Sequence, residues 1–229
     1  ECVEAIKKRF SSISIEVYPL SYQEYKELFN TGVDGLTLYQ ETYDEKLYSS
    51  LHLAGPKRDF ANRLLAPELA CRAGMRQVNI GSLLGLGDWR QEAYFTGLHA
   101  RWLMHNYPEV EIGVSLPRFK KHEGAFSCAN PVSDKEFVQI LIALRLFLPR
   151  ASISISTRES KNFRNNLIGL GVTRMSAGSH TEVGGYSSNE KTEGQFDIED
   201  PSSVEEVKEM IRLKGYQPVL KDWHPIYES

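Results

Sequence analysis

The chain has 229 residues, of which 41% are hydrophobic and 25% are charged, with a net charge of −3. This composition suits one domain with a sizeable core, and the slightly acidic balance argues against nucleic-acid or membrane-surface binding. No segment approaches the roughly 20 apolar residues of a membrane span. Cys2, Cys71 and Cys128 form no disulfide framework or metal-binding pair, which suits the reducing cytoplasm.

Strand-like and helix-like segments alternate along the chain. The opening "ECVEAIKKRF" is typical of the middle of a helix, and strand-like runs then begin near residues 13, 35, 77, 111, 152 and 172. Amphipathic stretches lie between these runs, the clearest of them over about residues 59–73 and 88–106.

Capping boxes of a serine followed three residues later by a glutamate mark the starts of further helices. They occur at Ser21 with Glu24, Ser133 with Glu136, and Ser202 with Glu205. Glycines close several of these segments, as expected for helix C-termini.

The alternation of strands and helices implies parallel strands and an α/β fold. A (β/α)8 barrel of the TIM type needs eight such units over about 250 residues, whereas six are visible here. We therefore predict a single domain over residues 1–229, built as an open sheet of about six parallel strands from a truncated barrel.

Each predicted strand has one aliphatic face and one small or polar face. Leu36 and Leu38, for example, alternate with Thr37, Tyr39 and Glu41. A barrel lumen is usually filled by Val, Ile and Leu, so a polar lumen indicates a ligand cavity, with Glu41 at its mouth. The alternative is an antiparallel sheet with one solvated face, which the intervening helices disfavour.

Six ordered motifs carry a resemblance to a known family: "VDGLTLYQETY", "GPKRDFANRL", "IGSLLGL", "VSLPRF", "ISISTRES" and "PVLKDW". They resemble the tyrosine lyases of the radical S-adenosylmethionine (SAM) superfamily, above all the 2-iminoacetate synthases of thiamine biosynthesis. The resemblance runs from about Ile13 to Trp223 and implies a radical SAM barrel.

The resemblance also implies cofactors and a reaction. Such enzymes hold a [4Fe–4S] cluster through a CxxxCxxC loop, and the cluster binds and cleaves SAM to a 5′-deoxyadenosyl radical. The radical abstracts hydrogen from L-tyrosine, and cleavage of the Cα–Cβ bond gives p-cresol and 2-iminoacetate (dehydroglycine) for thiazole formation. A one-electron reductant such as flavodoxin or ferredoxin and a thiazole synthase are the implied partners.

The chain departs from the family in lacking CxxxCxxC and the Gly-Gly-Glu motif of the second strand. We expect both upstream of residue 1, so that the chain would carry strands three to eight, no cluster ligands, and no activity alone. A degenerate paralogue is the alternative.

The resemblance assigns SAM contacts to several residues. Glu41 matches the acid that contacts the SAM ribose, with a salt bridge to a nearby arginine as the alternative. Arg58 matches a basic residue that meets the SAM carboxylate, and its alternative is a surface charge at a helix start. Ile80, Gly81 and Leu83 match the adenine contact, unless this segment is a plain strand-to-helix turn.

The resemblance assigns substrate contacts near the ends of later strands. Arg158 is expected to hold the tyrosine carboxylate, followed by Ser176 on the next strand. Arg118 is a second cation at the same mouth, and Tyr39 could line the cavity. A structural ion pair is the alternative for the arginines.

Other functions stay open at this point. The related tyrosine lyase of [FeFe]-hydrogenase maturation makes carbon monoxide and cyanide and carries a C-terminal extension with cysteines. A non-catalytic barrel that binds thiazole synthase, and a barrel lyase acting on a phosphorylated substrate, are less favoured. Residues of about 178–200 are expected to form a mobile loop over the mouth, either a lid or a plain solvated loop.

Overall fold

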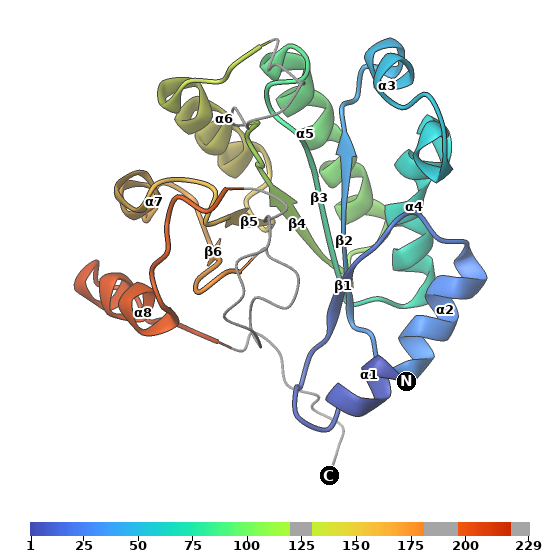
Figure 1. The fold of residues 1–229 in the computed structure, drawn as a ribbon, viewed down its shortest axis with the longest axis horizontal. Helices are drawn as coiled ribbons and strands as arrows, with labels where there is room; N and C mark the ends of the chain where they lie inside the picture. The colour runs from blue at the N-terminus through green and yellow to red at the C-terminus, as the bar shows by residue number, and fades with distance from the viewer. Residues whose placement is uncertain (120–129, 181–196, 221–229) are drawn as a thin grey trace.

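A computed structural model describes residues 1–119, 130–180 and 197–220. Six parallel strands form one curved sheet in sequential order, with β1 and β6 at its two edges (Figure 1). The strands are β1 (Ser14–Glu16), β2 (Gly35–Glu41), β3 (Gln77–Ser82), β4 (Glu111–Ser115), β5 (Ser152–Ile155) and β6 (Arg174–Met175). The predicted α/β fold with an open sheet of six parallel strands is therefore confirmed.

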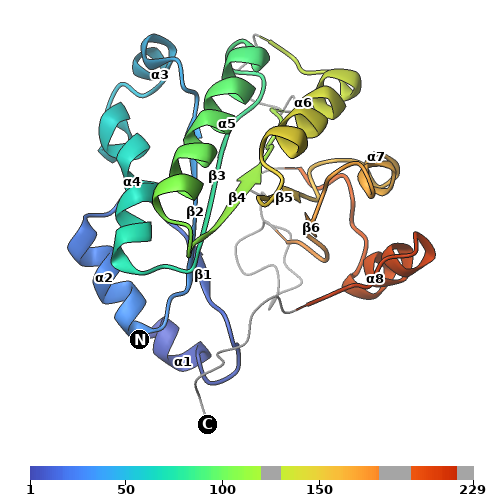
Figure 2. The same ribbon diagram turned by 180° about the vertical axis from the view of Figure 1, so that it is seen from behind.

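The helices between the strands lie on the outer, convex side. Figure 2 shows α5 in front of the middle of the sheet, α2 and α4 on the side of β1 and β2, and α6, α7 and α8 on the side of the last strands. The described helices are α1 (Cys2–Ile6), α2 (Tyr22–Thr31), α3 (Glu45–Leu51), a 3-10 turn (Pro56–Arg58), α4 (Phe60–Ala73), α5 (Trp89–Asn106), α6 (Asp134–Phe147), α7 (Lys161–Leu167) and α8 (Val204–Leu213).

The core lies between these helices and the aliphatic face of the sheet. Leu36, Val78 and Ile112 stand side by side on β2, β3 and β4, and all three are buried. Ala70 and Leu103 belong to the same cluster from α4 and α5. Burying each large aliphatic side chain contributes about 1.5–3 kcal/mol, which stabilises the packing of the helices on this face. The opposite, polar face is not part of this core.

The first two predicted capping boxes form as expected, but the third is displaced by one residue. The helix α8 is capped by Ser203 and Glu206, not by Ser202 and Glu205. Both pairs satisfy the same spacing. The backbone N–H of Ser202 instead donates to the carboxylate of Asp200 at 3.0 Å, and this buried turn fixes where the helix begins.

Two local features differ from the sequence predictions. The helix α3 was not predicted, although Asp44 caps it by accepting from the N–H groups of Lys46 and Leu47. The strand-like run expected to begin near residue 13 forms only the three-residue strand β1. The loop expected over about 178–200 falls largely outside the described residues, as does Cys128. No helix in the described part of the chain is long and apolar enough to cross a membrane.

Candidate active site

The polar face of the sheet is organised in layers that run across the strands. One layer contains Thr37, Asn79, Gly113 and Ser152, and the next contains Tyr39, Gly81, Ser115 and Ser154. Because side chains alternate along a strand, these residues face away from the aliphatic core. The carboxyl ends of the strands lie beyond the second layer, near Glu41.

Glu41 ends β2 in an unusual backbone conformation. Its φ of 70° is the one positive value at a non-glycine residue within the described ranges. The pairing register of β2 against β3 shifts at this point, and the N–H of Leu83 donates to the carbonyl of Glu41 at 2.7 Å. A left-handed conformation costs roughly 1–2 kcal/mol, and such strain clusters at ligand sites, which makes Glu41 a candidate contact residue.

Two basic side chains hold the Glu41 carboxylate. Arg63 Nη2 lies 3.1 Å from Oε1, and Lys57 Nζ lies 3.5 Å from the same oxygen. Arg63 Nε also donates to the carbonyl of Tyr39 at 2.6 Å. The ion pair named as the alternative for Glu41 therefore exists, and it leaves the second carboxylate oxygen, Oε2, for a ligand.

Arg63 on α4 contacts the Glu41 carboxylate, whereas Arg58 does not. Arg58 is exposed in the 3-10 turn, whereas Arg63 is 5% exposed. A signal for Arg63 was present in the sequence, because it is spaced at helical intervals from Ala66, Pro67 and Ala70, all on the buried face of α4.

The predicted adenine contact divides between the two faces of β3. Ile80 is buried on the helix side, so only its backbone can serve the polar face. Gly81 faces the polar side, where a Cβ atom would lie 2.3 Å from the carbonyl oxygen of Ser115. Only glycine fits there, and its bare backbone offers a flat surface to a ring.

Arg158 follows β5 and is half-buried near the residues at the end of β2. Burial lowers the pKa of its guanidinium, and the neighbouring Glu159, Tyr39 and Glu41 oppose that shift. Burial likewise raises the pKa of Tyr39, and the nearby Ser115 opposes that shift. A desolvated cation beside a neutral phenol suits an anionic ligand group.

Ser176 follows β6 and is fixed by a buried ion pair. Its N–H donates to the carbonyl of Ile155 at 3.1 Å, and its carbonyl accepts from Arg164. Arg164 is 0% exposed and pairs with Asp200 before α8. The role predicted for Ser176 stays a prediction, with its backbone position set by α7.

Arg118 is engaged in a structural ion pair, the alternative given for it, and its role as a substrate contact stays a prediction. Its Nε donates to Glu159 at 3.0 Å and its Nη1 to Asp134 at 2.8 Å, while Nη2 also pairs with Glu159. The carbonyl of Val132 accepts from Nη1 at 2.9 Å. All three nitrogens have partners and the side chain is buried, so the geometry favours the structural ion pair.

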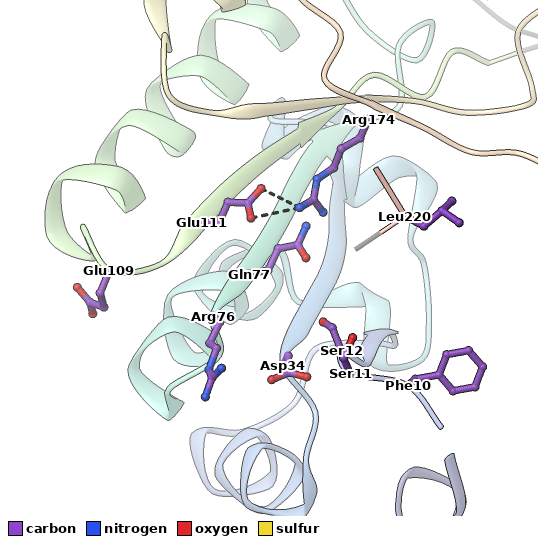
Figure 3. A pocket seen from close by; sticks show the side chains of 10 residues that line it. All are labelled: Phe10, Ser11, Ser12, Asp34, Arg76, Gln77, Glu109, Glu111, Arg174 and Leu220. Carbon is purple, nitrogen blue, oxygen red and sulfur yellow. Dashed lines mark hydrogen bonds and ion pairs between the residues drawn. The ribbon is translucent and has the colours of Figure 1, made fainter. Parts of the chain in front are cut away.

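A polar cavity of about 410 Å³ lies at the opposite, amino-terminal ends of the strands (Figure 3). Glu111 on β4 and Arg174 on β6 face each other across it, with Arg174 Nη2 2.9 Å from Glu111 Oε1. The pair connects strands that are not neighbours in the sheet. The pair therefore ties β4 to β6 at the end of the sheet opposite to Glu41.

Within the described ranges, no group of three or more His, Cys, Asp or Glu side chains could hold a metal ion. Cys2 is exposed on α1, and Cys71 is buried in α4, where desolvation raises the pKa of its thiol to about 12. A protonated thiol is a poor metal ligand. The described residues therefore do not fit an iron–sulfur cluster, and the roles of Glu41 and Gly81 as SAM contacts stay predictions.

The open parallel sheet, its outer helices and its polar inner face define part of a (β/α) barrel of the radical SAM kind. Residues 115–217 match the Biotin and Thiamin Synthesis associated domain. The fold matches two structures of the [FeFe]-hydrogenase maturase HydG, with TM-scores of 0.88 and 0.84 at 30% and 35% identity. These matches cover 96% and 94% of the chain and 50% of each maturase. Methylornithine synthase, 22% identical over 95% of the chain and 62% of its own, shares the fold with a TM-score of 0.71.

Among curated proteins, the chain is similar to 2-iminoacetate synthase from Salmonella typhimurium and from Escherichia coli. It is 40% identical to each, over 95% and 96% of its own length respectively. The resemblance that the motifs indicate is thus confirmed, and the chain is a relative of the 2-iminoacetate synthases. It spans 58% of the length of these two relatives.

Proposed function

We propose that this chain provides the SAM-contacting and substrate-contacting walls of a radical SAM tyrosine lyase. The enzyme would cleave the Cα–Cβ bond of L-tyrosine to p-cresol and 2-iminoacetate for thiazole formation in thiamine biosynthesis. The observation that carries the proposal is the 40% identity to 2-iminoacetate synthases across 95% of the chain.

The geometry supports distinct tasks at the two sides of the mouth. Glu41, held by Arg63, offers a carboxylate oxygen to the ribose hydroxyls of SAM, and the backbone at Gly81 lies beside the adenine. Arg158, with Ser176 on the next strand, binds the carboxylate of tyrosine. Tyr39 stands between the two groups, where it orients the substrate and excludes water.

The cofactors are SAM and a [4Fe–4S] cluster, and the cluster ligands are not among the described residues. When bound, the cofactors supply the radical that abstracts hydrogen from the substrate. We further propose a cytoplasmic location, a thiazole synthase as the acceptor of the product, and flavodoxin or ferredoxin as the reductant.

The hydrogenase maturase HydG provides the second candidate function, because its fold matches nearly the whole chain. The identity to 2-iminoacetate synthases, 40%, exceeds the 30% and 35% identity to the two maturase structures. Thiamine biosynthesis is therefore favoured.

A product assay separates the candidates. The full-length, cluster-loaded protein is incubated anaerobically with SAM, L-tyrosine and a reductant. Formation of p-cresol and 2-iminoacetate, which hydrolyses to glyoxylate, without carbon monoxide or cyanide supports the proposed function. Release of carbon monoxide and cyanide would assign the maturase reaction, and the absence of p-cresol would exclude both.

A further inference from the structure

Two buried polar atoms on the inner face of the sheet lack a partner among the described residues. They are Oδ1 of Asn79 on β3 and Oγ of Ser152 on β5, and each side chain is 8% exposed. Leaving a buried polar atom unpaired costs about 1–3 kcal/mol, so two of them in one place point to a group that completes their hydrogen bonds.

The two atoms flank one spot above Gly113 on β4. A Cβ atom added to Gly113 would lie 2.7 Å from Asn79 Oδ1 and 2.7 Å from Ser152 Oγ. Glycine thus leaves a small niche between the two atoms that any other residue would fill. The niche is defined by Asn79, Gly113 and Ser152, which share one layer of the sheet.

Polar side chains connect this niche to the mouth of the site. Asn79 Nδ2 donates to Ser115 Oγ at 2.8 Å, which aims Oδ1 away from Ser115. Tyr39 and Ser115 belong to the layer above the niche, and the charge of Arg158 acts on the Tyr39 phenol. A polar path therefore runs from Arg158 through Tyr39 and Ser115 down to the niche.

The depth of the niche suits the far end of an extended substrate. A strand rises about 3.3 Å per residue, so Ser152 lies roughly 13 Å below Ser156, where β5 gives way to the segment that carries Arg158. An amino acid held by its carboxylate at Arg158 would direct its side chain downward along this path. The group that arrives at the niche should both donate to Asn79 Oδ1 and bond to a serine hydroxyl, as a hydroxyl does.

We propose that Asn79 and Ser152 bind the phenolic hydroxyl of the substrate above Gly113 and so select tyrosine over phenylalanine. This inference rests on the proposed function. A site built to bond a hydroxyl rejects an analogue that lacks it, because its own buried polar groups would stay unpaired. The apolar body of the ring then lies against Tyr39 and the bare backbone of Gly113.

The test compares the binding of L-tyrosine and L-phenylalanine to the full-length, cluster-loaded protein with SAM, by equilibrium titration under anaerobic conditions. Asn79→Ala and Ser152→Ala should each lower the preference for tyrosine by about 10- to 100-fold, with phenylalanine binding unchanged or improved. Ser152→Ala removes an unpaired buried hydroxyl, so it should leave the thermal midpoint unchanged or raise it. If Ser152 only supported the fold, its replacement by alanine would lower the thermal midpoint.

Thr96→Val is the matched control, because it removes a buried hydroxyl from α5, on the helix side of the sheet. It should leave the tyrosine preference unchanged. If wild type binds tyrosine but both niche variants keep the full preference, the inference is wrong and the proposed function stands. If wild type does not bind tyrosine, both are wrong.

Discussion

Arg63 on α4 reaches Glu41 at the end of β2 with a distance of 3.1 Å between Nη2 and Oε1. The arginine is almost fully buried, and the glutamate has a left-handed backbone. A buried cation thus stabilises a strained residue at the point where the strand meets the mouth of the site. The pair links the packing of α4 to the position of the proposed SAM contact.

Replacing Arg63 by alanine should destabilise the protein by about 3 kcal/mol, because it removes the buried partner of a carboxylate and leaves the Tyr39 carbonyl without its donor. Denaturant unfolding measures the change. Lys57→Ala is the matched control, since Lys57 also contacts Glu41 but is half-exposed, and it should cost less than about 1 kcal/mol. Equal losses in the two variants would show that Arg63 does not support the strand end.

Replacing Arg158 by alanine in the full-length enzyme should abolish p-cresol formation while cluster content stays unchanged. Losing a charge-assisted carboxylate contact costs on the order of 2–4 kcal/mol, or roughly 30- to 1000-fold in kcat/KM. SAM cleavage without tyrosine should persist, since the arginine is assigned to the substrate. Arg150→Ala, an exposed arginine before the same strand, should behave as wild type. A normal p-cresol yield from Arg158→Ala would contradict the assignment.

Arg118 and Glu159 should behave as a buried pair with no part in substrate binding. Glu159→Ala leaves Arg118 buried without its main partner and should cost about 3–5 kcal/mol. Combining Arg118→Met with Glu159→Leu should recover most of this loss, which a double-mutant cycle in denaturant measures. A double variant that regains stability but loses tyrosine binding would return Arg118 to the substrate site.

The stability of the protein should fall on acidification through His99. Burial lowers the pKa of His99 to about 4, and its Nδ1 lies 2.9 Å from the hydroxyl of Tyr43. Between pH 6.5 and about 4 the unfolded chain binds a proton at this position that the folded chain does not, so stability falls as pH falls. The loss should approach about 3 kcal/mol at pH 4 and be absent above pH 6.5.

His99→Gln should flatten this part of the curve of unfolding free energy against pH. The exposed His105 on the same helix provides the control, because His105→Gln removes an imidazole that is not buried. An unchanged slope in His99→Gln would show that another group causes the acid sensitivity.

The two faces of each strand could be predicted from the sequence because aliphatic and polar residues alternate along it. Leu36 and Leu38 mark the outer, helix-covered face of β2, Thr37 and Tyr39 mark its inner face, and the structure has both faces as predicted. The site was harder to predict. Arg58 and Arg63 are equally cationic in the sequence, and only the turn of α4 decides which one reaches Glu41.

Short signals that occur in two registers were also ambiguous. Ser202 and Ser203 both satisfy the capping-box spacing, and the buried turn at Asp200 selects the second. The niche around Gly113 could not be predicted at all, because it requires Asn79 and Ser152 from non-adjacent strands to converge. Long-range register, which no local pattern encodes, creates that site.

The last prediction concerns this chain when it is produced by itself. Among the described residues, β1 and β6 are the edges of the sheet, and each pairs with a neighbouring strand on one side only. Edge strands present unpaired backbone groups that template association with other chains. We therefore expect the isolated chain to self-associate, as measured by sedimentation velocity, and Ser14→Lys, at an exposed position of β1, to reduce that association. Reconstitution with iron and sulfide should give no [4Fe–4S] absorbance, because Cys2 and Cys71 lie on different helices and the Cys71 thiol is buried. A stable monomer that binds a cluster and forms p-cresol would contradict this prediction and require other iron ligands.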